Sequence, residues 1–417
     1  MNTPSLERRL GLGDAVFIGL GSMIGAGVFA AFAPAAAAAG TGLLIGLAIA
    51  AVVAFGNATS SAQLAAAHPT SGGTYAYGRA ELGPWWGFIA GWGFVIGKIA
   101  SCAAMALTFA AYAAPPGWER PVAIAAVASL AAVNWFGITR TARLTRLIVV
   151  VSLLSLAVAV AAGASAPDAP GWLDTEALWA GGWYGILQSG GLLFFAFAGY
   201  ARIATMGEEV RDPARTIPRA IVLALAGTVV VYAAVGVALL STLGPEGTAG
   251  STEPLTDAVV AAGWEWATPI VRIGAAAASL GALLALITGV GRTTFAMARE
   301  DDLPRFLAVV HPRWRVPHRA EVAIAAIVIT IVALIDLRGA IGFSSFGVLL
   351  YYLIANFAAF RQRPPARRYP RLLQIVGAAG CVILGLTLPW QSVVAGVGMV
   401  LAGIVYRVVR GRITRAA

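Results

Sequence analysis

Two glycine-rich stretches interrupt long apolar segments of the sequence, and their backbone could bind a ligand. The first is GSMIGAGVF at Gly21–Phe29, and the second is FFAFAGY at Phe194–Tyr200. Each glycine lowers the helix preference by about 0.5–1 kcal/mol relative to alanine. An unpaired N–H or C=O group in hydrocarbon costs several kcal/mol more, so irregular backbone at membrane depth must be buried in protein or line a cavity.

A helix that is broken within a membrane exposes two kinds of backbone group. The N–H groups that begin the second half suit a carboxylate, and the C=O groups that end the first half suit an ammonium group or a small cation. Two such breaks that face each other would therefore bind a zwitterion. In the alternative, the glycines serve only close helix packing. The residues that we assign to this substrate site are Met23, Ile24, Gly25, Ala26, Gly27, Phe195, Ala196, Phe197, Ala198, Gly199 and Tyr200.

Two cationic side chains lie within or beside these apolar segments. Lys98 is the only lysine of the chain, in the middle of the third segment. A charged lysine at the bilayer centre costs roughly 2.5–3.5 kcal/mol on insertion scales and is a functional candidate by default. We predict that its protonation takes part in transport. The alternative is a lysine that is paired internally or reaches a water-filled vestibule.

Arg202 follows the second stretch and stays charged at any relevant pH, so it cannot carry a proton. It could bind a substrate carboxylate, hold a gate or reach the aqueous side. No Asp or Glu falls in the middle of an apolar segment to pair with it or with Lys98. This absence argues against substrates with two positive charges, and it favours a neutral or anionic substrate.

The composition requires a membrane protein. Of the 417 residues, 59% are hydrophobic and 12% are charged, and the mean hydropathy is +0.81. Soluble domains carry about 25% charged residues. At about 20 residues a span, we expect an all-α integral membrane protein with twelve transmembrane helices. The expected ranges are 14–39, 42–66, 84–113, 121–138, 146–164, 183–206, 219–243, 268–298, 321–337, 340–360, 372–388 and 391–409.

The formal net charge of +10 comes from arginines in short loops rather than from one basic patch. This distribution sets topology and does not indicate nucleic-acid binding. The loops 165–182 and 244–267 carry acidic residues and no basic ones. We therefore expect a multi-pass protein of the plasma (inner) membrane with both termini in the cytoplasm. The two cysteines and three histidines show no metal-ligand or catalytic spacing, so we expect no metal, no cofactor and no enzyme activity.

Four motifs in order resemble the amino acid–polyamine–organocation superfamily of permeases. They are Gly21–Phe29, the expected loop Pro69–Tyr77, Phe194–Ile221 and Gly291–Glu321. The resemblance implies a LeuT-type fold, in which two inverted five-helix repeats with discontinuous helices 1 and 6 are followed by two further helices. The first repeat would take residues 1–164. The second would take 165–337 and be completed by 340–360, and residues 361–417 would form the last two helices and the tail.

The resemblance also implies a secondary active transporter of amino acids that works by alternating access. The site would lie between spans 1, 3, 6 and 8, with Tyr200 as a gate above the substrate. Glu208, Glu209, Arg292 and Arg299 would belong to loops that lock and release, or would simply be solvated charges. Some proton-coupled relatives have a lysine in span 5, where this chain has Ser152. Proton symport is therefore expected with Lys98 as the candidate. An exchanger or uniporter of an amino acid or amine is the alternative, and a channel is a different class.

Overall fold

The computed structural model describes residues 10–68, 72–136, 142–167, 169, 172–200, 203, 210–314 and 316–416. Within these ranges the chain is helical, and its β-structure is limited to one isolated bridge between Leu10 and Val210. Three of the predicted site residues, Arg202, Glu208 and Glu209, lie outside the described residues.

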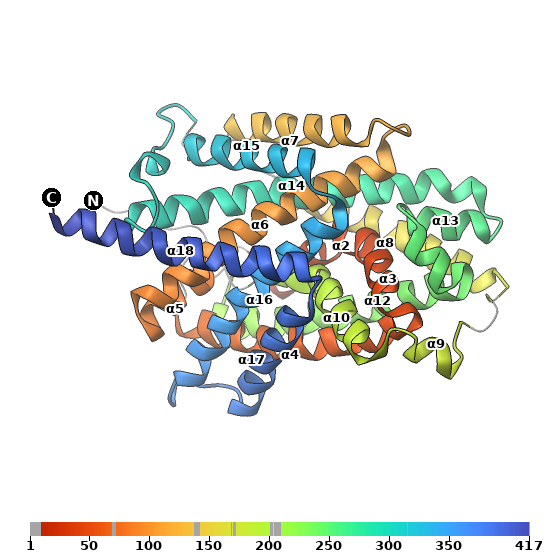
Figure 1. Cartoon of the computed structure of the whole chain (residues 1–417), viewed down its shortest axis with the longest axis horizontal. Helices are drawn as coiled ribbons and strands as arrows, with labels where there is room; N and C mark the ends of the chain where they lie inside the picture. Colours follow the sequence, from red (N-terminus) through yellow and green to blue (C-terminus); the bar gives the residue numbers. More distant parts are fainter. Residues whose placement is uncertain are drawn as a thin grey trace.

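The described residues of the first half of the chain form ten helices and two 3₁₀ turns (Figure 1). They are α1 (Leu12–Met23), α2 (Ala26–Ala30), α3 (Phe32–Ala39), η1 (Gly40–Gly42), α4 (Leu43–Ala67), α5 (Gly73–Leu82), α6 (Pro84–Ala113), α7 (Glu119–Trp135), α8 (Ala142–Ser165), α9 (Thr175–Trp179), α10 (Gly182–Phe197) and η2 (Ala198–Tyr200). The second half follows as α12 (Pro213–Gly250), α13 (Pro254–Ala261), η3 (Glu265–Ala267), α14 (Thr268–Arg299), η4 (Arg305–Ala308), α15 (His318–Leu334), α16 (Leu337–Arg361), α17 (Arg371–Thr387) and α18 (Trp390–Ala416).

Each of the twelve expected ranges overlaps a helix of the structure. Among the described residues, eight helical segments are long and apolar enough to cross a membrane. The remaining expected ranges fall on shorter helices: α10 has 16 residues, and α7, α15 and α17 have 17 each. The chain therefore has the helices of a multi-pass membrane protein.

The two ends of the bundle differ in charge. Helix α5 and the C-terminal end of α18 lie at one end, whereas α9 and α13 lie at the other (Figure 1). The first end carries arginines such as Arg79, Arg299 and Arg407, and we call it the basic end. The second carries the acidic residues of α9 and α13, Glu176 and Asp257, and we call it the acidic end.

The predicted interruption of the first span is present. Helix α1 ends at Met23, and α2 begins at Ala26. Ile24 and Gly25 between them have non-helical backbone angles, with ψ values of 58° and −148°. In the sixth span, the α-helix ends at Phe197 and tightens into the 3₁₀ turn η2.

Two boundaries differ from the sequence predictions. The predicted loop Pro69–Tyr77 is wrong over its second half, because Gly72 and Gly73 have positive φ and start the helix α5 there. Glycine adopts such angles at little cost. The pair therefore forms a tight turn into α5, and the loop is shorter than predicted. The predicted span 219–243 is longer in the structure, since α12 begins at Pro213, where proline suits the first turn.

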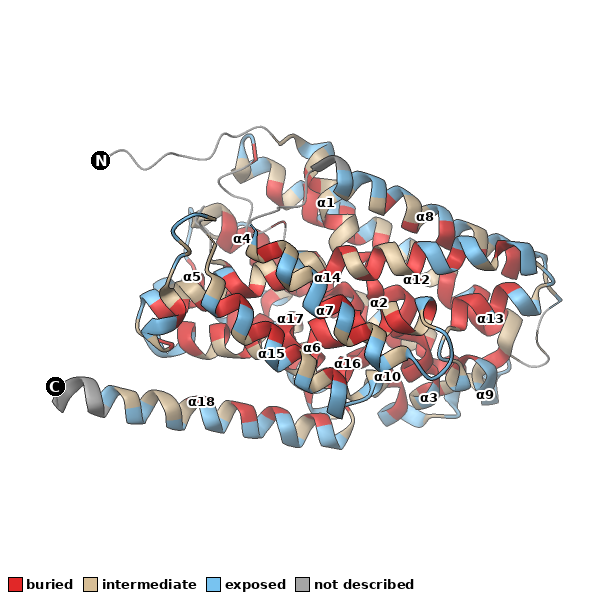
Figure 2. Ribbon diagram, turned by 90° about the horizontal axis from the view of Figure 1, so that it is seen from above, coloured by how far each residue is buried: buried red, intermediate tan, exposed pale blue. Residues whose placement is uncertain are grey.

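Buried residues gather where the interrupted helices cross the long ones. Figure 2 shows this in the middle of the bundle, around α2, α6, α10 and α16. Alanine and glycine allow this close packing: a Cβ added at Gly97 of α6 would lie 3.0 Å from the Cα of Gly347 in α16. By contrast, α18 lies along the outside (Figure 2), and much of its apolar surface is exposed.

Candidate functional site

The two interrupted stretches touch each other through backbone. A Cβ added to Gly27 would lie 2.6 Å from the Cα of Ala196. One added to Gly199 would lie 2.1 Å from the carbonyl oxygen of Ser22 and 2.6 Å from the amide nitrogen of Met23. Glycine is required at both places, because any side chain would overlap main chain that cannot rotate away. The sequence prediction that these two stretches face each other is therefore met by direct contact.

Tyrosine hydroxyls support the carbonyl groups at these breaks. The hydroxyl of Tyr232, in α12, lies 2.6 Å from the carbonyl oxygen of Met23 and 3.0 Å from that of Ala196. A hydroxyl has one proton to donate, so it binds one of these carbonyls at a time. The carbonyl of Met23 also accepts the backbone N–H of Gly25 at 2.8 Å. On α2, the carbonyl of Phe29 accepts from Tyr112 at 3.1 Å. Buried carbonyls at a helix end need such partners.

A cavity of about 500 Å³ lies beside the contact between the breaks. This volume is in the range of sites for small molecules. Its wall at the breaks consists of Gly21, Ser22, Met23, Gly25, Gly27, Phe195, Ala196, Ala198 and Gly199. The opposite wall comes from α6 and α14, and Gly72, Tyr75 and Tyr351 complete the lining toward the basic end. Arg292 and Arg299 on α14 line this part and are exposed, so water reaches the cavity from the basic end.

The face that α6 presents to the cavity carries Phe94, Lys98, Ser101 and Met105. Their spacing of four, three and four residues places them on one side of a helix. Lys98 is 7% exposed and has no hydrogen-bond or ion-pair partner among the described residues. Ser101 hydrogen-bonds to Ser344 of α16, with 2.6 Å between the oxygens. Lys98 is therefore the polar group of this face that only an occupant of the cavity could neutralise.

The structure brings together most of the predicted site residues. Of the eleven assigned to the breaks, seven line the cavity; Ile24, Ala26, Phe197 and Tyr200 do not. Tyr200, the predicted gate, is fully buried and its ring stacks on Tyr352, with 4.9 Å between centroids.

Among the coupling and gating candidates, Lys98 and Arg292 line the cavity. Ser152 lies on α8 outside it, and its hydroxyl donates to the carbonyl of Ile148 at 2.7 Å. Such a bond back to the preceding turn satisfies a serine within an apolar helix.

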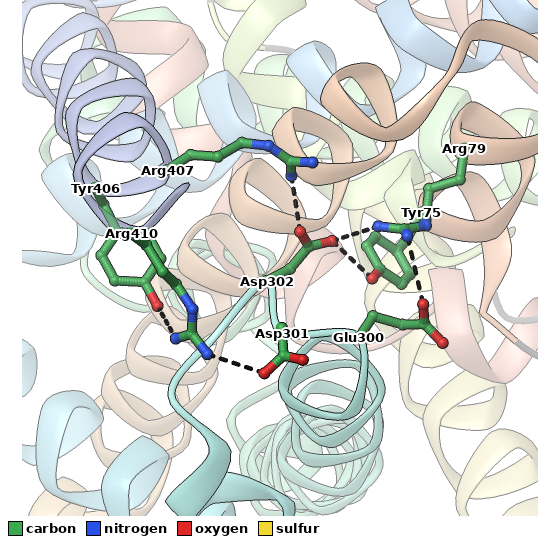
Figure 3. A network of polar contacts seen from close by, with 8 residues as sticks. All are labelled: Tyr75, Arg79, Glu300, Asp301, Asp302, Tyr406, Arg407 and Arg410. Carbon is green, nitrogen blue, oxygen red and sulfur yellow. Dashed lines mark hydrogen bonds and ion pairs between the residues drawn. The ribbon is translucent and has the colours of Figure 1, made fainter. Parts of the chain in front are cut away.

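A network of ion pairs closes around Asp302 at the basic end (Figure 3). Asp302 is 7% exposed; its Oδ2 accepts from Arg79 at 2.7 Å and from the Tyr75 hydroxyl at 2.8 Å, and its Oδ1 accepts from Arg407 at 2.8 Å. Burial raises the pKa of Tyr75, and its hydrogen bond to Asp302 adds to the rise. The hydroxyl therefore remains a donor at neutral pH. Because Tyr75 also lines the cavity, the network adjoins its wall.

The same network fastens α18 to the bundle. Arg407 pairs with Asp302 (Figure 3). Its guanidinium group also lies over the ring of Phe88, 4.7 Å from the ring centroid. Arg410 donates to Asp301 at 3.3 Å, and Arg305 also binds that carboxylate. The hydrogen bond from Arg305 lowers the pKa of Asp301. Segments that are far apart in the sequence, α5, the end of α14 and α18, are thus held together at the basic end.

Comparison with known proteins agrees with this architecture. The amino acid permease family model matches residues 10–409. The chain belongs to the amino acid permease family. The permease therefore has the sequence of a transporter, and membership of the family supports amino-acid transport as its function.

Relatives of the permease carry different descriptions. An uncharacterized transporter of Mycobacterium tuberculosis is 59% identical over 99% of this chain and 93% of its own length. A branched-chain amino acid permease of Bacillus subtilis is 26% identical over 96% and 92%. The human cationic amino acid transporter 4 is 28% identical over 84% of this chain and 58% of its own length.

Sequence reasoning missed two parts of the site. Tyr232 is one such residue, although a tyrosine in an apolar span signals a hydroxyl that needs a buried partner. Asp302 is the other: it lies within the last quoted motif of the permease, but its partners Arg79 and Arg407 are 223 and 105 residues away. No local pattern indicates a contact over that separation.

We expect Tyr232→Phe to destabilise the permease by about 1 kcal/mol, because the carbonyls of Met23 and Ala196 lose their buried donor. Thermal unfolding in detergent measures the change. Tyr184→Phe is the control, since Tyr184 is 58% exposed. Equal stability of the two variants would contradict a structural role for the Tyr232 hydroxyl.

Proposed function

We propose that the permease is a secondary active transporter that moves amino acids by alternating access and couples this movement to protons. The observation that carries the proposal is the cavity whose wall includes the backbone of the first interruption, at Ile24 and Gly25, and of the end of α10 with η2, which contact each other. In this assignment the amides at the start of α2 bind the substrate carboxylate, apart from that of Gly25, which already donates to the carbonyl of Met23 at 2.8 Å. The carbonyl of Ala196, which shares the Tyr232 hydroxyl with that of Met23, binds the ammonium group.

Neutral or anionic amino acids fit the cavity better than cationic ones. Its described lining contains Lys98, Arg292 and Arg299 and no carboxylate. A substrate with two positive charges would enter without a counter-ion, and burying an unpaired charge is costly. The relative named as a cationic amino acid transporter shares only 28% identity with this chain, so its description does not outweigh the lining charges.

The cavity opens toward the basic end, and this opening supports an assignment of the conformational state in the transport cycle. We propose that the basic end faces the cytoplasm of the plasma membrane, because arginine-rich loops favour that side. The cavity that water enters from this end then corresponds to a state open to the cytoplasm. The two inverted repeats predicted for 1–164 and 165–360 would rock against each other, and Tyr200 would turn from its stack on Tyr352 toward the substrate. Roles for Arg202, Glu208 and Glu209 stay predictions.

Transport and coupling are tested together in proteoliposomes. The purified permease should accumulate labelled amino acids from a panel when an inside-alkaline pH gradient is imposed, and to a lesser extent without it. Counterflow that is independent of the gradient would favour an exchanger or uniporter. An ionic conductance that no amino acid saturates would indicate a channel. If no amino acid accumulates or exchanges through folded protein, the proposed function is wrong.

We expect Lys98→Met to abolish the response of uptake to the pH gradient, because Lys98 is the one titratable amine in the described cavity lining. The measurement is the ratio of uptake with and without the gradient, which should fall to about one. Arg338→Gln, which removes an exposed cation far from the cavity lining, is the control and should leave the ratio unchanged. A normal ratio in Lys98→Met would assign coupling to another group.

A further inference from the structure

Lys98 is a buried cation without a counter-ion in the described part of the chain. Its side chain is 7% exposed, lines the cavity and makes no hydrogen bond or ion pair there. Lysine is seldom buried unless it is paired. A charged amine in this position therefore needs an anion that comes from outside the protein, and such an anion can reach Lys98 through the cavity that it lines.

A zwitterionic substrate does not supply that anion in full. Its carboxylate and ammonium groups neutralise each other across the two breaks, so the charge of Lys98 stays uncompensated. Met105, on the same face of α6, lies seven residues from Lys98, or about 10 Å along the helix. Lys98 therefore lies in the middle of α6 and nearer to the basic end than Met105 does, because α6 begins beside α5 at that end. Phe94 and Leu286 make this part of the wall apolar around one ammonium group.

We infer that the cavity takes an acidic amino acid, and that Lys98 pairs with the carboxylate of its side chain. This inference rests on the proposed function and names the substrate class of the same site. A wall that combines apolar side chains with the cations Lys98, Arg292 and Arg299 fits a short methylene chain that ends in a carboxylate. Removal of the Lys98 cation would leave that carboxylate buried and unpaired, which is strongly unfavourable.

The pair also explains how a proton could move with the substrate. A neutral Lys98 amine takes up one proton as the anionic substrate binds, and the change of state then exposes the ammonium–carboxylate pair to the other side. On the other side the substrate leaves and the amine releases the proton, so one proton and one substrate are transferred. Because each partner favours binding of the other by the same free energy, coupling needs no acidic residue of the protein.

Other charged and titratable groups surround this pair. None of those in the described cavity lining is an acid. They are Arg292 and Arg299 on α14, Tyr75 on α5 and Tyr351 on α16, together with Cys102 on α6 itself. Glu321 of α15, which is 4% exposed, interacts electrostatically with Arg292. The two arginines stay protonated and add to the attraction for an anion. They do not titrate, so they cannot supply the proton.

The test compares labelled glutamate, aspartate and leucine in proteoliposomes that contain the full chain, with and without an inside-alkaline gradient. Wild type should accumulate the acidic amino acids, and Lys98→Met should lower their uptake by at least about thirtyfold, the effect of losing one buried charge partner. Lys98→Arg keeps the cation and should still exchange glutamate in counterflow, but it should lose gradient-driven accumulation because arginine does not release its proton. Arg338→Gln should behave as wild type.

Thermal shift provides a readout that does not depend on turnover. Glutamate should raise the melting temperature of wild type and of Lys98→Arg, but not that of Lys98→Met. If wild type transports leucine and ignores acidic amino acids, the inference fails while the proposed function stands. Glutamate uptake by Lys98→Met at the wild-type rate would also overturn the inference. No transport of any amino acid by folded wild type would instead refute the proposed function.

Discussion

Replacing Gly199 with alanine should abolish transport and lower the stability of the folded permease. The new Cβ would lie 2.1 Å from the carbonyl oxygen of Ser22 and 2.2 Å from its carbonyl carbon. Both atoms belong to the main chain of α1, so no side-chain rotation relieves the overlap. Overpacking of this kind costs about 1–3 kcal/mol. It also separates the two breaks whose backbone groups would bind the substrate.

The measurements are the melting temperature in detergent and uptake into proteoliposomes. Gly13→Ala is the matched control, because Gly13 is exposed on α1 and no atom lies within 4 Å of its added Cβ. Alanine there should keep activity and slightly favour the helix. A Gly199→Ala protein with wild-type uptake would show that the breaks need not touch.

Asp302→Asn should have the second large effect. The carboxylate binds Arg79, Arg407 and Tyr75 while it is nearly buried. Removal of its charge leaves Arg407 without the carboxylate of Asp302 and leaves Arg79 with Glu300, at 3.3 Å, as its acidic partner. Loss of one partner from a buried ion pair costs about 3–5 kcal/mol, and we expect the lower end because Arg79 and Arg407 keep 28% and 17% side-chain exposure.

The neighbouring substitution Asp301→Asn is the control for this prediction. Asp301 has a φ of +60°, which asparagine tolerates, and its partner Arg305 is exposed. Exposed ion pairs contribute little to stability. The melting temperature should therefore fall for Asp302→Asn and barely change for Asp301→Asn. Similar losses in both variants would show that burial of Asp302 does not decide its importance.

The sequence was sufficient to locate the break in the first span. Gly21, Gly25 and Gly27 disfavour a continuous helix, and the interruption lies at Ile24 and Gly25. The stripe of Phe94, Lys98, Ser101 and Met105 also follows from helical periodicity once the cavity is known. These features depend on local backbone preference and on spacing within a single helix.

Features that depend on long-range packing could not be predicted in this way. Gly72 and Gly73 indicate a loop in isolation, but they begin α5, whose Tyr75 and Arg79 bind Asp302 more than 220 residues later. The tyrosine hydroxyl on the two breaks likewise joins α12 to α1 and α10. Only the assembled helices decide which polar groups meet, since every span has a similar apolar composition.

Contact between Gly27 and Ala196, and between Gly199 and Ser22, fixes the spacing of the two breaks. The polar groups that the two breaks offer to a ligand are peptide N–H and C=O groups, which a change of side chain does not remove. Under the proposed function, descendants of such a protein could therefore change ligand preference by altering α6 and α14 alone, while these peptide groups would still bind the carboxylate and ammonium groups that all amino acids share.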